Sequence, residues 1–395
     1  MASTVDNDLD ALVRTVISEL AAFERGSASA GEQRAAELIA AQFEAEGASA
    51  RVEQEQAHGT YWWPLGTLTL AAGIASFFRS RLLRTAIGGF CAAALADDIS
   101  GGSHWYRRAV LPRQSTWNVV AESGDRAAER TVVVVAHHDA ANWSLLFAPQ
   151  LPQRIGDRFP QLLERSNTTP AVMFPVFGGP LLTAIGGLSG SKLLRRLGGF
   201  LSLASALTFA EIGSRSVVPG ANDNLSGVAV LVGLARALRG QPLDGLRVIL
   251  LSTGSEESFM EGMRGFARRH FSSLSTATTS FVCVDSVGSP TLMQLEGEGM
   301  LWMRDYPEPL KRRLSEAADE LEVPLVRGLR FRNATDGLIS LQAGYPTIML
   351  GSISKYKAPS NYHWPTDTAE NVDYSSVVDA TNVCERLLRK LAAER

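Results

Sequence analysis

The chain has 395 residues, of which 45% are hydrophobic and 20% are charged, with 38 Lys and Arg against 41 Asp and Glu. A disordered chain would be richer in charge, and a nucleic-acid-binding protein would carry a basic excess, so this composition excludes both classes. The 3 cysteines are too few for a disulfide framework or a zinc site built from thiolates.

The first 60 residues read as two helices and a strand. Apolar residues recur at helical spacing over 9–20, a second helix is predicted over about 31–46, and residues 48–56 alternate as in a strand. This segment has neither a basic start nor a continuous apolar stretch, so we expect no cleaved signal peptide. We assign residues 1–60 to the N-terminal helices and first strand of the main domain.

Two later stretches, at 64–96 and 171–210, concentrate the apolar residues. Each has two apolar segments joined by a short basic turn, and both are rich in Gly, Ala, Ser and Leu. A membrane-spanning helix needs about 20 residues, and these segments are at or below that length. Two interpretations stay open: buried helical hairpins that cap a soluble domain, or hairpins that dip into or cross a membrane.

An aromatic cluster, Tyr61, Trp62 and Trp63, stands at the mouth of the first hairpin, as an interfacial belt would, and favours membrane association. A cytoplasmic location is the alternative, and neither the orientation nor the oligomeric state follows from the sequence. We therefore expect an apolar hairpin over 61–100 and a core domain over 101–395 that a second hairpin interrupts at about 171–210.

The rest of the chain alternates between strands and helices. The strand segments are nearly continuous in apolar character, which is typical of strands covered on both faces. Strands are expected at 116–122, 131–136, 247–252, 280–284 and 346–350, and helices at about 224–239, 258–269, 308–321, 336–343 and 374–392. The alternation predicts an α/β fold, with a mostly parallel mixed sheet flanked by helices.

Ligands bind outside the carboxyl ends of the strands in such sheets, and His or carboxylate residues stand there in this sequence. Imidazole nitrogen and carboxylate oxygen are zinc ligands, and a mixed set suits two metals bridged by one carboxylate. The residues are His137 and Asp139 after the second of these strands, Asp223 in Pro-Gly-Ala-Asn-Asp-Asn before a helix, Glu256 and Glu257 after the third, Asp285 after the fourth, and His363 near the C-terminus.

These blocks resemble the co-catalytic di-zinc aminopeptidases, metallopeptidase family twenty-eight of clan MH. The family's order is His-x-Asp, Pro-Gly-Ala-x-Asp-Asn-x-Ser-Gly, Glu-Glu, Asp and His, and all five blocks occur in that order over about 116–390. The resemblance implies a zinc-exopeptidase-like fold and two zinc ions. The second hairpin falls in the 84-residue gap between Asp139 and Asp223, as an insertion would.

The resemblance also implies a role for each residue. His137 and Asp285 would bind one zinc, Glu257 and His363 the other, and Asp223 would bridge the two. Glu256 would take a proton from the attacking water and pass it to the leaving amine, and Asp139 would orient His137. His138, between them, is read as a packing residue or pocket wall.

The sequence departs from the family pattern after the Glu-Glu pair. The family continues x-Gly-x-x-Gly-Ser, whereas this chain has Ser258-Phe259-Met260-Glu261-Gly262-Met263 and keeps only the second Gly. Phe259 and Met260 would be bulky near the site and alter substrate preference. Arg332 precedes the segment that matches a Ser-Asp-His-type block. It could steady a developing oxyanion, bind a substrate carboxylate, or lie on the surface.

These features predict a zinc-dependent metallopeptidase that acts on peptides, and the leading expectation is an aminopeptidase. The presence of His137 argues against a related glutaminyl cyclase, which would lack the first His and use one zinc. The alternatives are a catalytically silent membrane receptor or scaffold on the same fold, or a membrane-associated endoprotease or amidohydrolase. No nucleic-acid partner is expected.

Overall fold

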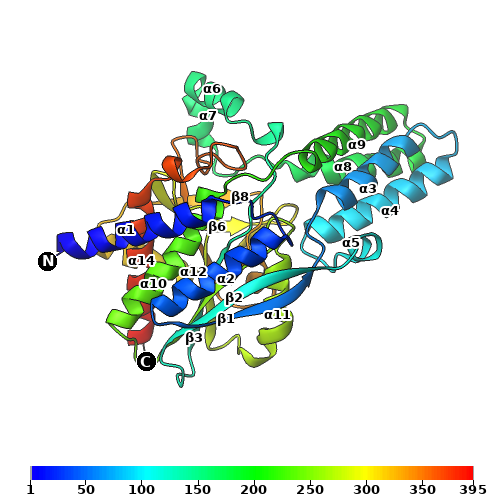
Figure 1. Ribbon diagram of the computed structural model, residues 1–395. Coiled ribbons are helices and arrows are strands. Elements are labelled where there is room, and N and C mark those ends of the chain that lie inside the picture. Colours follow the sequence, from blue (N-terminus) through cyan, green and yellow to red (C-terminus); the bar gives the residue numbers. More distant parts are fainter. Residues whose placement is uncertain (1, 395) are drawn as a thin grey trace.

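A single mixed sheet forms the centre of the molecule (Figure 1). The structure is a computed structural model that describes residues 2–394, with side chains from residue 7 onward. The strands in the described chain are β1 (Ser49–Ala57), β2 (Gln114–Gly124), β3 (Thr131–His137), β4 (Arg247–Thr253), β5 (Thr279–Val284), β6 (Thr291–Glu298), β7 (Arg304–Asp305), β8 (Leu325–Phe331) and β9 (Thr347–Ile353).

The strand order is β1-β2-β4-β3-β5-β9-β6-β7, with β8 also paired to β6. The four central strands β4, β3, β5 and β9 run parallel to one another, so their carboxyl ends meet at one edge. Antiparallel strands flank this centre: β2 pairs with β4, β1 with β2, and β6 with β9. This mixed sheet flanked by helices confirms the predicted zinc-exopeptidase-like fold class.

Helices cover both faces of the parallel centre, which is why every residue of β3 and β9 is buried. The helices α1 (Ala2–Ala21), α2 (Ala30–Ala45), α10 (Ser226–Gly240), α12 (Glu308–Glu320) and α14 (Tyr374–Ala393) lie together on one face. The helices α11 (Glu261–His270) and α13 (Gly337–Gln342) contact each other, and α11 packs on β1 and β2.

The two apolar stretches fold into a four-helix bundle that projects from the sheet domain (Figure 1). Its helices are α3 (Trp62–Ala75), α4 (Arg81–Ile99), α8 (Met173–Ser189) and α9 (Lys192–Gly213). α9 packs against α3 and α8, α4 packs against α8 and α3, and the basic residues lie at the far end of the bundle. In the second hairpin the turn is Gly190–Ser191, and Lys192, Arg195 and Arg196 belong to the start of α9 rather than to the turn.

The predicted strands and long helices all occur within a few residues of their expected bounds. The strands β6, β7 and β8 were not expected, nor were the short helices α5 (Trp105–Val110), α6 (Gln150–Arg158) and α7 (Pro160–Arg165). Only two of the residues of β8 are buried, Leu329 and Phe331, because this strand lies toward the edge of the sheet and pairs with β6 alone among the described strands. It therefore lacks the continuous apolar character by which central strands are recognised.

Candidate metal centre

The carboxyl edge of the parallel strands gathers the predicted site residues. His137 is the last residue of β3, Asp285 follows β5 directly, and Glu256 and Glu257 follow β4 after a short turn. Asp223 lies in the irregular turn before α10, and His363 comes from the loop after β9. Residues from five separate segments therefore converge because the central strands run in the same direction.

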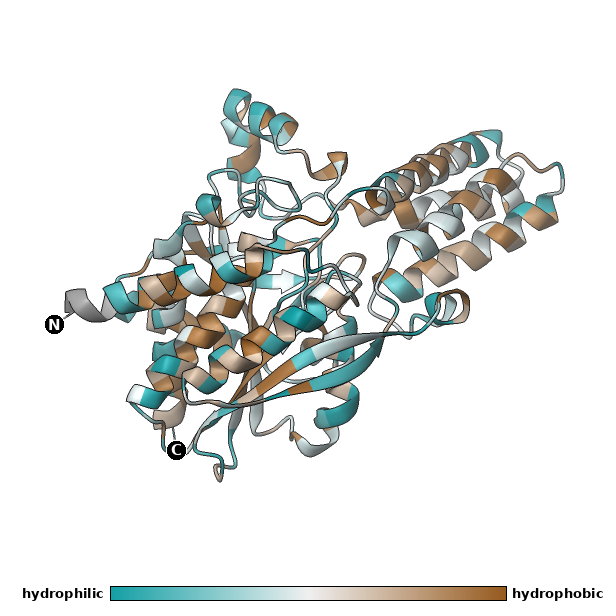
Figure 2. Cartoon of the chain, viewed as in Figure 1, coloured by the Kyte–Doolittle hydropathy of each residue, from teal (hydrophilic) through white to brown (hydrophobic). Residues whose placement is uncertain are grey.

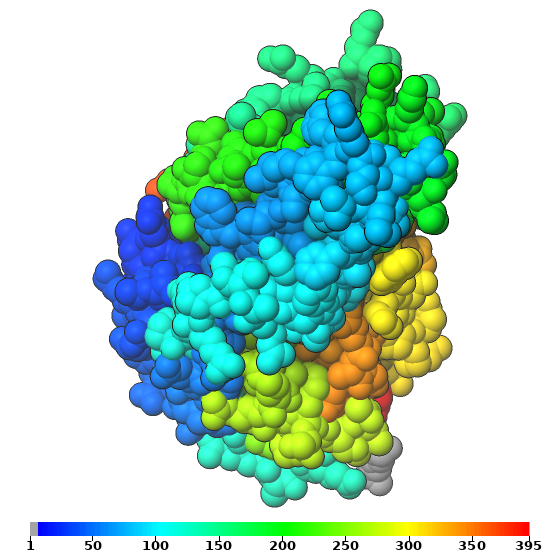
Figure 3. Space-filling model, turned by 90° about the vertical axis from the view of Figure 1, so that its right-hand side faces the viewer, coloured from blue at the N-terminus to red at the C-terminus, as the bar shows by residue number. Residues whose placement is uncertain are grey.

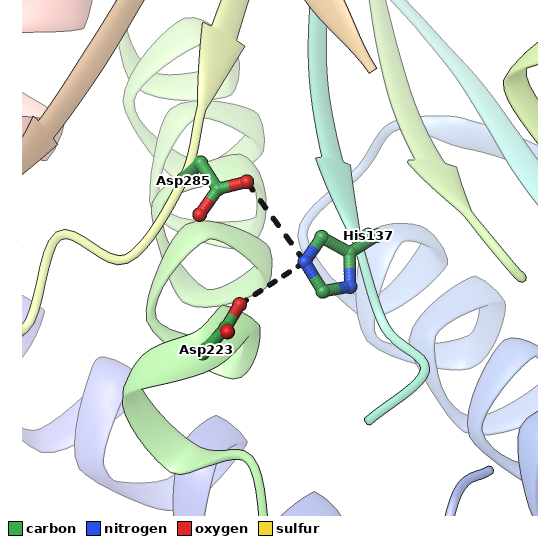
Figure 4. A group of neighbouring side chains, drawn as sticks. All are labelled: His137, Asp223 and Asp285. Carbon is green, nitrogen blue, oxygen red and sulfur yellow. Dashed lines mark ion pairs between the residues drawn. The ribbon is translucent and has the colours of Figure 1, made fainter. Parts of the chain in front are cut away.

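One half of the centre is formed by His137, Asp223 and Asp285 (Figure 4). The His137 Nε2 atom lies 3.2 Å from Asp223 Oδ1 and 3.9 Å from Asp285 Oδ2. All three side chains point toward a common point between β3, β5 and the start of α10, as Figure 4 shows. Their ligand atoms lie within 4.8 Å of one another, which is a spacing that one metal ion can fill.

The other half is formed by Asp223, Glu257 and His363. His363 Nε2 lies 3.2 Å from Asp223 Oδ2 and 3.3 Å from Glu257 Oε1. Asp223 therefore directs one carboxylate oxygen to each His. The buried Glu257 Oε1 accepts no hydrogen bond from the described residues, although His363 Nε2 is close. A lone pair left without a donor beside an imidazole nitrogen is what a metal ligand requires, so the donor set fits two zinc ions.

Burial and mutual charge shift the pKa values of these groups. Burial opposes ionisation of Asp223, but hydrogen bonds with His137 and His363 outweigh it and lower the pKa of the carboxyl. Burial and the neighbouring Asp223 charge raise the pKa of Asp285 to about 6. Burial lowers the pKa of His363, but the charge of Glu257 and the bond to Asp223 outweigh it and raise the value to about 10. The buried carboxylates of the centre thus attract positive charge, which protons on His137 and His363 supply in the metal-free chain and which metal cations could supply in their place.

Glu256 lies beside His137 and Glu257, and these three residues also offer ligand atoms within 4.8 Å of one another. The Glu256 Oε2 atom lies 3.9 Å from His137 Nε2, and its side chain lines the cavity beside the centre. Burial raises its pKa well above the usual range, and the charges of Glu257, Asp336 and Asp285 add to this although His137 opposes it. A carboxyl that takes up a proton readily, next to a metal-ligand set, is suited to proton transfer.

Asp139 contacts both the His137 ring and the backbone of the turn that carries Glu256 and Glu257. Its Oδ1 lies 3.4 Å from His137 Nδ1, and its backbone carbonyl lies 3.1 Å from the same nitrogen. Its carboxylate also accepts hydrogen bonds from the backbone N–H groups of Glu256 (2.9 Å) and Glu257 (3.1 Å) and from the Ser27 hydroxyl (2.6 Å). Asp139 therefore fixes the Glu-Glu turn as well as the His137 ring. The neighbouring His138 is buried and its Nδ1 lies 2.9 Å from Ser252 Oγ, as expected of a packing residue.

Two supporting carboxylates escaped the sequence reasoning. Asp367 accepts hydrogen bonds from the backbone N–H groups of Asn222 (2.7 Å) and Asp223 (3.1 Å), so it holds the turn that carries the bridging carboxylate. Glu32 of α2 accepts bonds from the backbone N–H (3.1 Å) and hydroxyl (2.8 Å) of Ser255, directly before Glu256. A sequence signal existed for Glu32 only as a helix-start pattern, Ser29-x-x-Glu32, which does not reveal its distant partners.

A cavity of about 740 Å³ opens beside the centre and includes Glu256, Glu257 and His363 in its wall. Much of the remaining wall is apolar or aromatic, with contributions from Tyr61, Phe147, Met173, Phe259, Met260, Met300 and Phe331. Phe259 and Met260 therefore lie near the site, as expected. Arg332 also lines this cavity, with its guanidinium 5.3 Å from the centre of the Phe174 ring.

Residues 207–388 match the family model described as peptidase family M28. The chain therefore contains a region of peptidase family M28 over just under half of its length. The matched range contains Asp223, Glu256, Glu257, Asp285 and His363, and the fold places His137 beside them. The predicted family is confirmed. No curated protein matches the chain in sequence.

Several solved structures resemble the chain over nearly its whole length. The zinc aminopeptidase BSAP from Bacillus subtilis has a TM-score of 0.56 at 13% identity and covers 97% of this chain and 95% of its own. The aminopeptidase from Aneurinibacillus sp. strain AM-1 has a TM-score of 0.56 at 13% identity, covering 96% and 93%. A glutaminyl cyclase from Bacteroides thetaiotaomicron has a TM-score of 0.57 at 12% identity, covering 99% and 98%. Because the identities are this low, these similarities establish a shared fold and nothing more.

Proposed function

We propose that this M28 peptidase is a zinc-dependent aminopeptidase that binds two zinc ions. The observation that carries the proposal is the position of Asp223, whose two carboxylate oxygens each lie 3.2 Å from a different buried imidazole. One carboxylate between two His residues, each with a further carboxylate beside it, is the arrangement that a bridged metal pair needs. The similarity to solved aminopeptidases supports the proposal at the level of fold.

His137 and Asp285 would hold one zinc ion, His363 and Glu257 the other, and Asp223 would contact both. When bound, the two ions would supply Lewis acidity for the scissile carbonyl and favour ionisation of the attacking water. The protein provides the fixed geometry for this chemistry, because His137, Glu257 and Asp285 lie at or just after the ends of buried strands and Asp223 lies in a turn held by Asp367.

Glu256 would hold the proton of the attacking water at its carboxylate and pass it to the leaving amine. Its side chain faces the cavity and lies beside His137, while its backbone N–H donates to Asp139 Oδ1. That hydrogen bond fixes the start of the side chain, so Asp139 acts as a positioning residue for Glu256 as well as for His137. The apolar wall with Phe259 and Met260 would receive an apolar side chain of the peptide.

The test is a comparison of the wild-type chain with Glu256→Gln and with Glu37→Gln, which changes an exposed carboxylate on α2. We expect two zinc ions in all three proteins, and a fall of about 10²–10⁴-fold in kcat for Glu256→Gln alone. Peptides with a free amino end should lose residues from that end, and the same peptides with an acetylated amino end should resist. Internal cleavage of acetylated peptides would contradict the aminopeptidase assignment, and full activity of Glu256→Gln would contradict the role of Glu256.

A further inference from the structure

The four-helix bundle has small residues inside and large apolar residues outside, which is the reverse of a soluble bundle. Most buried positions are Gly, Ala, Ser or Thr: Thr69, Ala72, Gly73, Ala75, Gly88, Ala92, Ala94, Gly179, Thr183, Ala184, Gly186, Gly187, Gly198, Gly199, Ser202 and Ser205. The larger buried apolar side chains lie in the half of the bundle nearer the peptidase domain: Leu65, Leu68, Leu95, Ile99, Val176, Phe209 and Ile212. The exposed apolar positions include Leu70, Ile74, Phe77, Leu82, Leu83, Phe90, Leu181, Ile185, Leu188, Leu193, Leu197, Phe200 and Leu207. Figure 2 shows that apolar residues recur along the helices of the bundle.

The small residues allow the helix backbones to approach closely. A Cβ atom added to Gly88 of α4 would lie 2.7 Å from the backbone nitrogen of Ala184 on α8. A Cβ atom on Gly198 of α9 would lie 2.5 Å from the backbone nitrogen of Thr183, and one on Gly186 would lie 2.6 Å from that of Arg195. Helices that pack through small residues in this way are typical of association in lipid, where apolar side chains gain nothing by turning inward.

Exposed apolar side chains occur on all four helices rather than on one face of the bundle. Leu188 of α8 is 77% exposed, Leu82 of α4 is 77% exposed, and Phe200 of α9 is 68% exposed. One helix in the described chain, Lys192–Gly213, is long and apolar enough to cross a membrane by length and composition. Only 33% of its most apolar 18-residue stretch is buried inside the structure. A helix of a soluble core would bury most of such a window. A surface that is apolar all round calls for an apolar solvent, not for a single docked partner.

The far end of the bundle is basic. Arg79, Arg81, Lys192 and Arg196 are exposed there, and the described structure gives none of the four a carboxylate partner. Arg84, nearby, donates to the carbonyl oxygens of Phe78 and Arg79 and closes the turn between α3 and α4. We call the segments 78–84 and 190–196 the basic tip; they contain no Asp or Glu. Figure 3 looks toward the bundle from this side.

We propose that the bundle crosses a lipid bilayer, with the basic tip among anionic headgroups on one side and the peptidase domain on the other. A bundle that ended inside the hydrocarbon would bury the charges of the tip there, which is costly, whereas a bundle that crosses brings them to headgroup phosphates. The uncharged stretches between the tip and the base are 85–96 in α4 and 197–210 in α9, which at a rise of 1.5 Å per residue are about 18 Å and about 21 Å long. The hydrocarbon core is about 30 Å thick, so the long Arg and Lys side chains of the tip would extend to the headgroups and the bilayer would thin around the bundle.

The base of the bundle has the features of the opposite interface. Trp63 is 55% exposed and Trp105 is 39% exposed there, where an aromatic belt would meet the headgroups. The charged residues resume at the same level: Asp98 is paired with Arg107, and Glu211 lies 2.6 Å from Arg215. Because Tyr61 and Met173, at the starts of α3 and α8, also line the cavity, the metal centre would open close to the membrane surface.

Cysteine labelling in membranes tests the crossing directly. The native cysteines Cys91, Cys283 and Cys384 are all buried, so the wild-type chain serves as the unlabelled reference. Ser189→Cys places an exposed thiol beside the basic tip, and Ser275→Cys places one on the peptidase domain. With a maleimide that cannot cross membranes, we expect one variant to be labelled in sealed vesicles and the other only after permeabilisation, and the reverse in vesicles of opposite orientation.

Membrane extraction provides the second readout. The wild-type chain should stay in the membrane through an alkaline carbonate wash and leave it only with detergent. The double change Leu188→Glu and Phe200→Glu should lose this resistance, whereas Trp302→Glu, which changes an exposed apolar residue of the peptidase domain, should keep it. Labelling of both cysteine variants from the same side, release by carbonate, or a detergent-free dimer that covers the bundle would each overturn the proposal. None of these readouts depends on zinc or on peptide hydrolysis.

Discussion

The ring of Phe259 stacks on the ring of Tyr61, with the centroids 4.8 Å apart and the planes 13° from parallel. Phe259 follows the Glu256–Glu257 pair, and Tyr61 directly precedes α3, so this contact joins the metal-centre turn to the base of the bundle. Phe259 has a φ of +72°, and it stands where the M28 pattern has Gly. A left-handed backbone is strained for an aromatic residue, and the stacking contact with Tyr61 offsets that strain.

Two substitutions of Phe259 should separate the destabilisation caused by its strained backbone from the stabilisation given by the packing of its ring. Both Phe259→Ala and Phe259→Gly remove the stacked ring, but only Gly adopts a positive φ without strain. We expect Phe259→Gly to be more stable than Phe259→Ala by about 1–2 kcal/mol, as judged from denaturant unfolding of the two proteins. Equal stability would show that the backbone relaxes at this position. Both variants should also enlarge the apolar wall of the cavity and improve kcat/KM for substrates with bulkier side chains.

Asp139→Asn should weaken the metal centre without removing a ligand. Asp139 uses both carboxylate oxygens to accept backbone N–H groups of the Glu-Glu turn, and an amide can offer only one oxygen. We expect zinc affinity or kcat/KM to fall about 10–100-fold. Asp244→Asn, on an exposed loop, is the matched control. If neither the zinc affinity nor the pH profile of kcat/KM changed, the turn would be held without Asp139.

The sequence allowed the convergence of these His and carboxylate residues to be predicted, because each follows an apolar strand or stands in a recognisable block. Parallel pairing then brings the ends of β3, β4 and β5 together without any further information. The supporting residues were harder to find. Asp367 lies 144 residues from Asp223 and contacts only its backbone, so no local pattern marks it. Glu32 reaches Ser255 across 223 residues for the same reason.

Only some features of the bundle could be predicted from the sequence. Apolar runs and basic turns predict hairpins, and the structure contains helices there. Hydropathy does not say which side of a helix faces its neighbours, however. The arrangement of Gly88 against Ala184 and of Gly198 against Thr183 emerges only when the two hairpins, about 100 residues apart, pack together. The distinction between an inside of small residues and an outside of large ones is therefore a property of the tertiary structure.

Changes at the bridging and terminal ligands should have different effects on zinc content. Asp223 lies against both His residues, whereas the nearest imidazole nitrogen to Glu257 Oε1 is that of His363, at 3.3 Å. Asp223→Asn should therefore reduce binding of both zinc ions, and Glu257→Gln should leave about one per chain, held by His137 and Asp285. Elemental analysis after dialysis measures this. Two zinc ions retained by Asp223→Asn would contradict the bridging role.

Zinc should stabilise the chain more strongly as the pH rises. In the metal-free chain the pKa of His363 is raised from 6.5 to about 10, so the proton stabilises the fold fully below about 6.5 and this contribution is lost as the pH rises through about 10. Asp285, with a pKa raised to about 6, also holds its proton more tightly in the folded chain and acts in the same direction at lower pH. Zinc needs neutral imidazole and ionised carboxylate, so it competes with these protons. The difference in Tm between zinc-loaded and chelator-treated protein should grow steadily from about pH 6 to about pH 9, and His363→Gln should flatten the decline of the metal-free chain over the same range. A difference in Tm that stays constant or shrinks with rising pH would mean that zinc does not displace protons from these residues.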